Sequence, residues 1–403
     1  MKSLPVLITV LSLFALSAWA TRHLGTQGTL IPSVGSLLRP VTADPGSGQP
    51  ARIDVAFVLD TTGSMSGLIE GAKRKIWAIA SDLAGRQPAP VLRIGLVAYR
   101  DRGDAYVTRI TPFSSDLDRI FAELTALRAG GGGDTPESVN EALARAVNEL
   151  AWTPPGDGKA SGAAVRTLFL VGDAPPHRDY PNDVPYTDTA TRARQAGIRI
   201  HTIQCGNLAG TEPVWREIAR LAEGGFVPLA QDGNMQVVTT PYDADIQALN
   251  RELSRTLVAY GDRRRRVEVK AKAGLAAAAP AATSADRQAF IRNTNRADEA
   301  VVTGSGDLIA DLNAGRIDLD AVKDSDLDSH LQGLSQKAFE RALEAKRQQR
   351  RHLQARLDRL LEKRAAHLRE AAESAPAEAP AFDREVVGLV EAQIAERREP
   401  ADT

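Results

Sequence analysis

Five side chains that carry oxygen donors lie next to apolar segments in this chain, and together they could bind a divalent metal ion. These residues are Asp60, Thr62, Ser64, Thr135 and Asp173. The first three directly follow an apolar run that ends at Leu59, and the last follows a run that ends at Val171. Carboxylates and hydroxyls are hard ligands, which suit Mg²⁺ or Mn²⁺ better than zinc or copper. The residue types therefore indicate an oxygen-only metal site if the fold brings them together.

Apolar runs alternate with helical patterns across the segments that must position these donors. The expected strands are 55–59, 93–99, 106–113, 167–171, 198–205 and 226–229. The expected helices are 65–83, 139–150, 187–196, 214–222 and 243–260. This alternation predicts an α/β fold with a doubly wound, mostly parallel, six-stranded sheet. Ligands of such sheets bind beyond the carboxyl ends of the strands, so we expect the donors to converge there.

The segments that carry the donors resemble the metal-ion-dependent adhesion site (MIDAS) of von Willebrand factor type A (VWA) domains. The family's first motif usually reads Asp-x-Ser-x-Ser, and Asp60-x-Thr62-x-Ser64 keeps the hydroxyl at the middle position. The resemblance covers about residues 53–262 and is strongest for the bacterial and kinase-associated branch, which shares the wording Asp-Thr-Thr-Gly-Ser-Met and Gly-Gly-Asp-Thr-Pro-Glu. It implies the strand order 3-2-1-4-5-6 in a Rossmann-like sheet.

The same resemblance implies how the ion would be held. Thr62, Ser64 and Thr135 would offer hydroxyls, while Asp60 and Asp173 would bind directly or through water. With two carboxylates, Mg²⁺ or Mn²⁺ keeps open positions that an acidic group of a partner could fill.

We therefore expect a non-enzymatic, metal-dependent protein-binding module whose protein ligand presents a carboxylate, since no nucleophile or proton relay is evident. Two alternatives stay open. One is a metal-dependent hydrolase in the same fold, and the other is a structural envelope protein that binds through its helical domain.

Charge and cysteine content exclude several other classes of protein. Fifty basic and fifty-one acidic side chains leave a net charge of −1, which opposes a globally basic nucleic-acid binder. The single cysteine, Cys205, excludes an intramolecular disulfide framework and a cysteine-rich zinc or iron–sulfur site. Because Cys205 ends an apolar strand pattern, we expect it to be buried.

The first twenty residues have the features of a secretory signal peptide. Lys2 precedes an apolar run from Leu4 to Leu16, and Ala18-Trp19-Ala20 forms a small-x-small ending. An uncleaved membrane anchor is the alternative, because the stretch from Leu4 to Ala20 is just long enough to span a thin bilayer. We expect a secreted or periplasmic protein, with membrane or envelope association if the anchor is kept. A Gly-, Pro- and Ser-rich flexible linker at 21–52 follows.

Beyond residue 262 the pattern becomes mainly helical. We expect a mixed, acidic linker region at 263–330, in which the alanine-rich stretch 275–282 is a loop. A helical hairpin at 331–403 would follow, with its turn around 374–380. Its leucines, which include Leu353, Leu357 and Leu360, are expected to form a hairpin core and not a coiled-coil seam, because the heptad does not continue.

Two parts of this C-terminal region have opposite charge. Residues 298–328 contain nine acidic and two basic side chains, whereas 341–369 contain ten basic and three acidic ones. The basic segment could bind anionic lipid or nucleic acid. We favour a solvated face or pairing with the acidic segment of the same chain.

Overall fold

The computed structural model describes residues 52–85, 90–154, 164–295, 299–374 and 380–396. The expected signal peptide at 1–20 and the linker at 21–52, apart from Arg52, lie outside the described residues. No helix within the described ranges is both long and apolar enough to cross a membrane.

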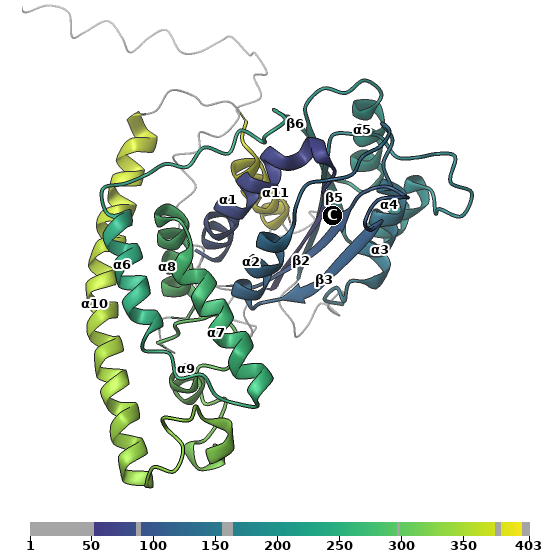
Figure 1. Ribbon diagram of the computed structural model, residues 1–403. Helices are drawn as coiled ribbons and strands as arrows, with labels where there is room; N and C mark the ends of the chain where they lie inside the picture. The colour runs from purple at the N-terminus through teal and green to yellow at the C-terminus, as the bar shows by residue number, and fades with distance from the viewer. Residues whose placement is uncertain (1–51, 86–89, 155–163, 296–298, 375–379, 397–403) are drawn as a thin grey trace, which may run out of the picture. The chain divides into compact units, whose positions relative to one another are not determined.

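Six strands form one sheet in the order β3-β2-β1-β4-β5-β6, as predicted (Figure 1). They are β1 (Arg52–Asp60), β2 (Val91–Tyr99), β3 (Thr108–Ser114), β4 (Val165–Gly172), β5 (Arg199–Cys205) and β6 (Phe226–Leu229). β3 is antiparallel to β2, and the other neighbours are parallel. The parallel strands therefore end at one edge of the sheet, which we call the carboxyl edge.

Alternate residues of β1 belong to two separate hydrophobic clusters, because successive side chains of a strand point to opposite faces. Val55, Phe57 and Leu59 pack with α1 (Ser66–Ala84) and α2 (Leu117–Ala126). Ala56 and Val58 belong to the cluster on the other face. The helices of that face are α3 (Val139–Glu149), α4 (Tyr186–Gln195) and α5 (Thr211–Leu221). The sheet is thus covered on both faces, as its continuous apolar strands predict.

α2 is not among the expected helices, although its apolar spacing is helical. Leu117, Ile120, Phe121 and Leu124 follow the i, i+3, i+4, i+7 pattern and are all buried. Asp116 accepts a hydrogen bond from the backbone N–H of Arg119 and caps the helix. Cys205 is free and buried, as expected.

The expected loop at 275–282 is wrong, because most of this stretch is helical. α7 (Arg263–Ala278) continues through it, and α8 (Ala281–Asn295) begins two residues after Ala279. Alanine has the highest helix propensity, so an alanine-rich stretch continues a helix until a breaker occurs. Pro280 supplies the break here.

The remaining elements follow α6 (Asp243–Ser254), α7 and α8 along the chain. They are α9 (Leu308–Asn313), the 3-10 turns η3 (Leu319–Ala321) and η4 (Asp324–Asp326), α10 (Gln336–Ser374) and α11 (Phe382–Glu396).

The last two helices do not share the core that a hairpin would have. Leu353, Leu357 and Leu361 of α10 pack with α6 and with Ala285 of α8. The apolar face of α11 belongs instead to the cluster of β1 and α1, where Phe382 and Phe57 have ring centroids 6.0 Å apart. Gln393 of α11 also donates to the carbonyl of Arg166 in β4 at 3.2 Å. The helical spans are correct, and the predicted hairpin pairing is corrected.

Buried ion pairs join these helices to neighbouring elements. Arg287 of α8 pairs with Asp118 of α2 at 2.7 Å, and both side chains are 1% exposed. Arg350 of α10 pairs with Asp307 at 2.7 Å. The second pair bears out the expected contact between the basic and acidic segments of the chain. Breaking such a pair leaves an uncompensated buried charge, so each pair favours one packing arrangement.

His201 in β5 makes stability depend on pH. Its ring stacks on Phe169 with centroids 5.3 Å apart, and its Nδ1 accepts a hydrogen bond from Gly225 N–H at 2.9 Å. Burial, helped by the charge of Arg199, lowers the pKa of His201 from 6.5 to about 4. The unfolded chain therefore takes up a proton between these two pH values that the native state does not bind.

We predict that the free energy of unfolding falls as pH decreases from about 6.5 to about 4, by up to roughly 3 kcal/mol from this residue at about 1.4 kcal/mol per pKa unit. His201→Gln stays neutral and keeps an acceptor for Gly225, so it should remove that part of the pH dependence. Urea unfolding at several pH values measures the slope. The exposed His352→Gln is the control, and equal slopes for the two variants would show the explanation to be wrong.

Candidate metal centre at the carboxyl edge of the sheet

Asp60 and Asp173 lie next to each other because β1 and β4 are adjacent and parallel. Leu59 pairs with Val171, so the residues that follow them meet at the carboxyl edge. A Cβ on Gly172 would lie 3.0 Å from Asp60 Cβ and 2.5 Å from Tyr99 Oη, so this close approach requires glycine. The structure thus brings two donors far apart in the sequence to one place.

Asp60 is fully buried and only half satisfied by hydrogen bonds. Its Oδ1 accepts from Thr62 N–H at 2.8 Å and from Thr62 Oγ1 at 2.6 Å. Its Oδ2 has no hydrogen-bond partner among the described residues. The pKa of Asp60 is raised to about 7, mainly by burial. The hydrogen bonds from Thr62 lower it, whereas the charge of Asp173 acts in the same direction as burial. The charge of Arg100 lowers the pKa, but the described hydrogen bonds of Arg100 go to the backbone carbonyls of Thr61 and Arg128, so Oδ2 of an ionised Asp60 has no donor among the described residues.

Thr62, Ser64 and Asp173 complete a group of adjacent oxygen atoms around Asp60. Thr62 Oγ1 lies 3.3 Å from Ser64 Oγ. Asp173 Oδ2 accepts from Gln231 Nε2 at 2.7 Å, and the same amide donates to the backbone carbonyl of Ser64 at 3.3 Å. Gln231, which follows β6, is a neighbour of these donors that no motif in the sequence marks.

Thr135, the fifth predicted ligand, lies exposed in the loop at 127–138 that precedes α3. The described contacts between this loop and the Asp60 segment come from its glycines. Gly63 N–H donates to the carbonyl of Gly131 at 3.3 Å, and a Cβ on Gly132 would lie 3.2 Å from Thr62 Cβ. The loop reaches the site, but the structure does not bring the Thr135 hydroxyl into the group of oxygen atoms, and its role stays a prediction.

Two further buried groups at this edge were not predicted. Tyr99 Oη and Glu137 Oε2 have no hydrogen-bond partner within the described ranges. Burial raises the pKa of Glu137 to about 9, and the charges of Asp60, Asp101 and other carboxylates raise it as well. The pKa of Tyr99 is raised by burial and then by the charges of Asp60 and Glu137. The edge therefore contains several buried oxygen atoms that have no hydrogen-bond donor among the described residues.

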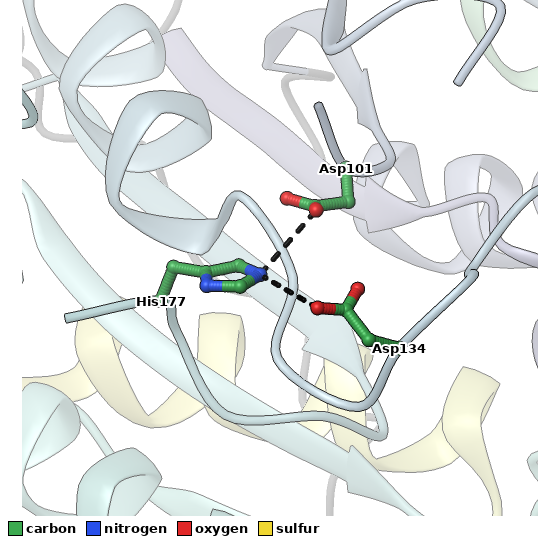
Figure 2. Close-up of side chains that lie close together, drawn as sticks. All are labelled: Asp101, Asp134 and His177. Carbon is green, nitrogen blue, oxygen red and sulfur yellow. Dashed lines mark ion pairs between the residues drawn. The ribbon is translucent and has the colours of Figure 1, made fainter. Parts of the chain in front are cut away.

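A second group of side chains at this edge consists of Asp101, Asp134 and His177. Their nearest nitrogen and oxygen atoms all lie within 4.8 Å of one another. Figure 2 shows His177 Nε2 directed between the two carboxylates, 3.3 Å from Asp101 Oδ2 and 3.7 Å from Asp134 Oδ2. Asp101 follows the end of β2 and His177 follows that of β4, so the rule that places Asp60 at this edge also applies to them.

Comparison with known proteins agrees with this fold. Residues 54–181 match the family model of the von Willebrand factor A domain. The von Willebrand factor A domain-containing protein 7 of Rattus norvegicus is 37% identical over 122 residues, which are 30% of this chain and 12% of that protein. The alpha-protein kinase vwkA of Dictyostelium discoideum is 28% identical over 127 residues, which are 31% of this chain and 19% of the kinase.

Among solved structures, the SpRpn10 VWA domain is similar over 46% of this chain and 91% of that domain, with 14% identity and a TM-score of 0.34. The strand order and the family model define the fold.

The chain therefore contains a von Willebrand factor A domain, a fold that often mediates metal-dependent protein binding. It covers only a small part of the curated relatives, 12% of the rat protein and 19% of the kinase.

Proposed function

We propose that this protein is a non-enzymatic, metal-dependent protein-binding module. In this proposal Mg²⁺ or Mn²⁺ is held by Asp60, Thr62, Ser64, Thr135 and Asp173, and a carboxylate of the protein partner completes the coordination.

The observation that carries the proposal is the state of Asp60. Its side chain is 0% exposed, and Oδ2 has no hydrogen-bond partner in the described part of the chain. Leaving an ionised carboxylate buried without a partner costs several kcal/mol. A divalent cation beside Oδ2 would offset that cost and would also draw on the neighbouring Asp173, Thr62 and Ser64.

The distribution of exposure favours recognition at the protein surface. Asp60 and Thr62 are buried and Asp173 is half-buried, whereas Ser64 and Thr135 are exposed. An ion held between these residues would be bound by Asp60 and Thr62 on its buried side and would be accessible to solvent on the other side. Mg²⁺ prefers octahedral oxygen coordination and exchanges its remaining waters for anionic oxygen, so a partner carboxylate is the matching ligand.

Export from the cytoplasm belongs to the same proposal. The signal-peptide pattern of residues 1–20 supports a secreted or periplasmic location, where the partner would be an extracellular or envelope protein.

Calorimetric titration of the full chain with MgCl₂ or MnCl₂ tests the metal site. We expect binding to the wild type and at least a roughly tenfold loss of affinity in Asp60→Asn and Asp173→Asn, because each variant removes one carboxylate ligand. Asp188→Asn, which changes an exposed aspartate of α4, is the matched control and should bind normally. Absence of heat in the wild type, or binding by the two site variants that equals that of the wild type, would contradict the site.

Capture of partners from an envelope extract tests the function. We expect EDTA and Asp60→Asn each to abolish capture, and added Mg²⁺ to restore it for the wild type after EDTA is removed. Capture that survives EDTA would instead favour binding through the C-terminal helices. Turnover of phosphate or ester substrates by the wild type that is lost in Asp60→Asn would favour a metal-dependent hydrolase.

A further inference from the structure

We infer that Asp101, Asp134 and His177 form a second metal site, which takes a divalent transition ion such as Zn²⁺. It uses none of the five residues assigned to the Mg²⁺ site, so it does not depend on the proposed function. Its ligand set contains an imidazole nitrogen, which Zn²⁺ accepts readily and Mg²⁺ does not favour.

The distances within the group fit ligands that share one ion. His177 Nε2 lies 3.3 Å from Asp101 Oδ2 and 3.7 Å from Asp134 Oδ2. The second distance is too long for a hydrogen bond, and the first is longer than the usual range. Two ligands of a tetrahedral zinc ion, each at about 2.0–2.2 Å from the metal, lie about 3.4 Å apart.

His177 is held so that Nε2 points into this space. The residue is 6% exposed, and Nε2 has no hydrogen-bond partner among the residues that the structure describes. Its ring stacks on Tyr180 with centroids 4.0 Å apart, and Nδ1 lies 2.7 Å from Asp179 Oδ1. A hydrogen bond from Nδ1 to a carboxylate is the usual way in which a metal-binding histidine is oriented, and it leaves the lone pair on Nε2.

The backbone around His177 is also fixed. Its N–H donates to the carbonyl of Glu137 at 3.1 Å, and its carbonyl accepts from Asn140 Nδ2 at 2.8 Å.

The two carboxylates differ in exposure. Asp101 is buried, and its oxygens accept hydrogen bonds from Ser138 Oγ and Tyr180 Oη, each at 2.8 Å. Asp134 has a side chain that is 61% exposed. The ion would therefore meet two preformed ligands first, and Asp134 would close the site from the loop. Because Asp134 directly precedes Thr135, this closure would also fix the backbone beside the predicted Mg²⁺ ligand.

Charge distinguishes a metal from a simple ion pair. Three carboxylates, those of Asp101, Asp134 and Asp179, lie against the His177 ring, and among them the charge of Arg102 acts on Asp179. A doubly protonated His177 would offset one negative charge, whereas a divalent cation offsets two and leaves the Asp179 hydrogen bond intact. The metal is the better match for this excess of negative charge.

Cobalt substitution tests the site in tag-free full chain, because Co²⁺ mimics Zn²⁺ and its visible absorption bands report coordination. We expect one equivalent of Co²⁺ to give bands that Zn²⁺ removes and excess Mg²⁺ does not. Asp134→Asn and His177→Gln should each weaken Co²⁺ binding at least roughly tenfold. Asp134 is exposed, so its variant should fold even if His177→Gln does not.

Three further variants complete the experiment. Asp188→Asn and His352→Gln change exposed residues elsewhere and should bind Co²⁺ normally. Asp60→Asn should also keep the cobalt bands while losing Mg²⁺ binding, which separates this inference from the proposed function. Absent bands in the wild type, bands unchanged in Asp134→Asn, or bands lost in Asp60→Asn would each overturn the second site.

Discussion

The carboxyl edge of this sheet concentrates buried negative charge, and the functional conclusions depend on that concentration. Asp60, Glu137 and Asp101 are 0%, 3% and 4% exposed. Burial, followed by the charge of Asp173, raises the pKa of Asp60 to about 7. Burial, followed by the charges of Asp60 and Asp101, raises the pKa of Glu137 to about 9. Buried carboxylates stay ionised only when positive charge lies beside them. Asp60 Oδ2 and His177 Nε2 have no hydrogen-bond partner among the described residues, and they mark the positions where cations would supply that charge.

The apolar layers on the two faces of the sheet hold this unfavourable edge together. Val55, Phe57 and Leu59 face one cluster, and Ala56 and Val58 face the other, so β1 is fixed along its length up to Asp60. α11 contributes to the first cluster, which makes the C-terminal helix part of the packing beneath the site. Burial of apolar surface contributes about 25 cal/mol per Å² to folding, and this stabilisation can offset the local repulsion between the carboxylates.

Sequence reasoning predicts the strands and the Asp60 group because both signals are local. A continuous apolar run identifies a buried strand, and the polar residue after it must lie at the carboxyl edge. The pairing of α10 and α11 with their neighbours is a tertiary property, since an apolar helical stripe does not specify which surface covers it. Asp101 and His177 also follow strands, so the same rule places them at this edge. Their proximity to Asp134 depends on the conformation of the loop before α3, which no local pattern specifies.

The two donor sets at this edge differ in a way that separates their functions. The Asp60 group offers only oxygen and opens towards solvent, which suits an exchangeable Mg²⁺ that binds a partner's carboxylate. The His177 group includes a fixed nitrogen donor, which suits a tighter, slowly exchanging ion. Glu137 interacts electrostatically with Asp60 and with Asp101, so an ion in either site would lower its raised pKa.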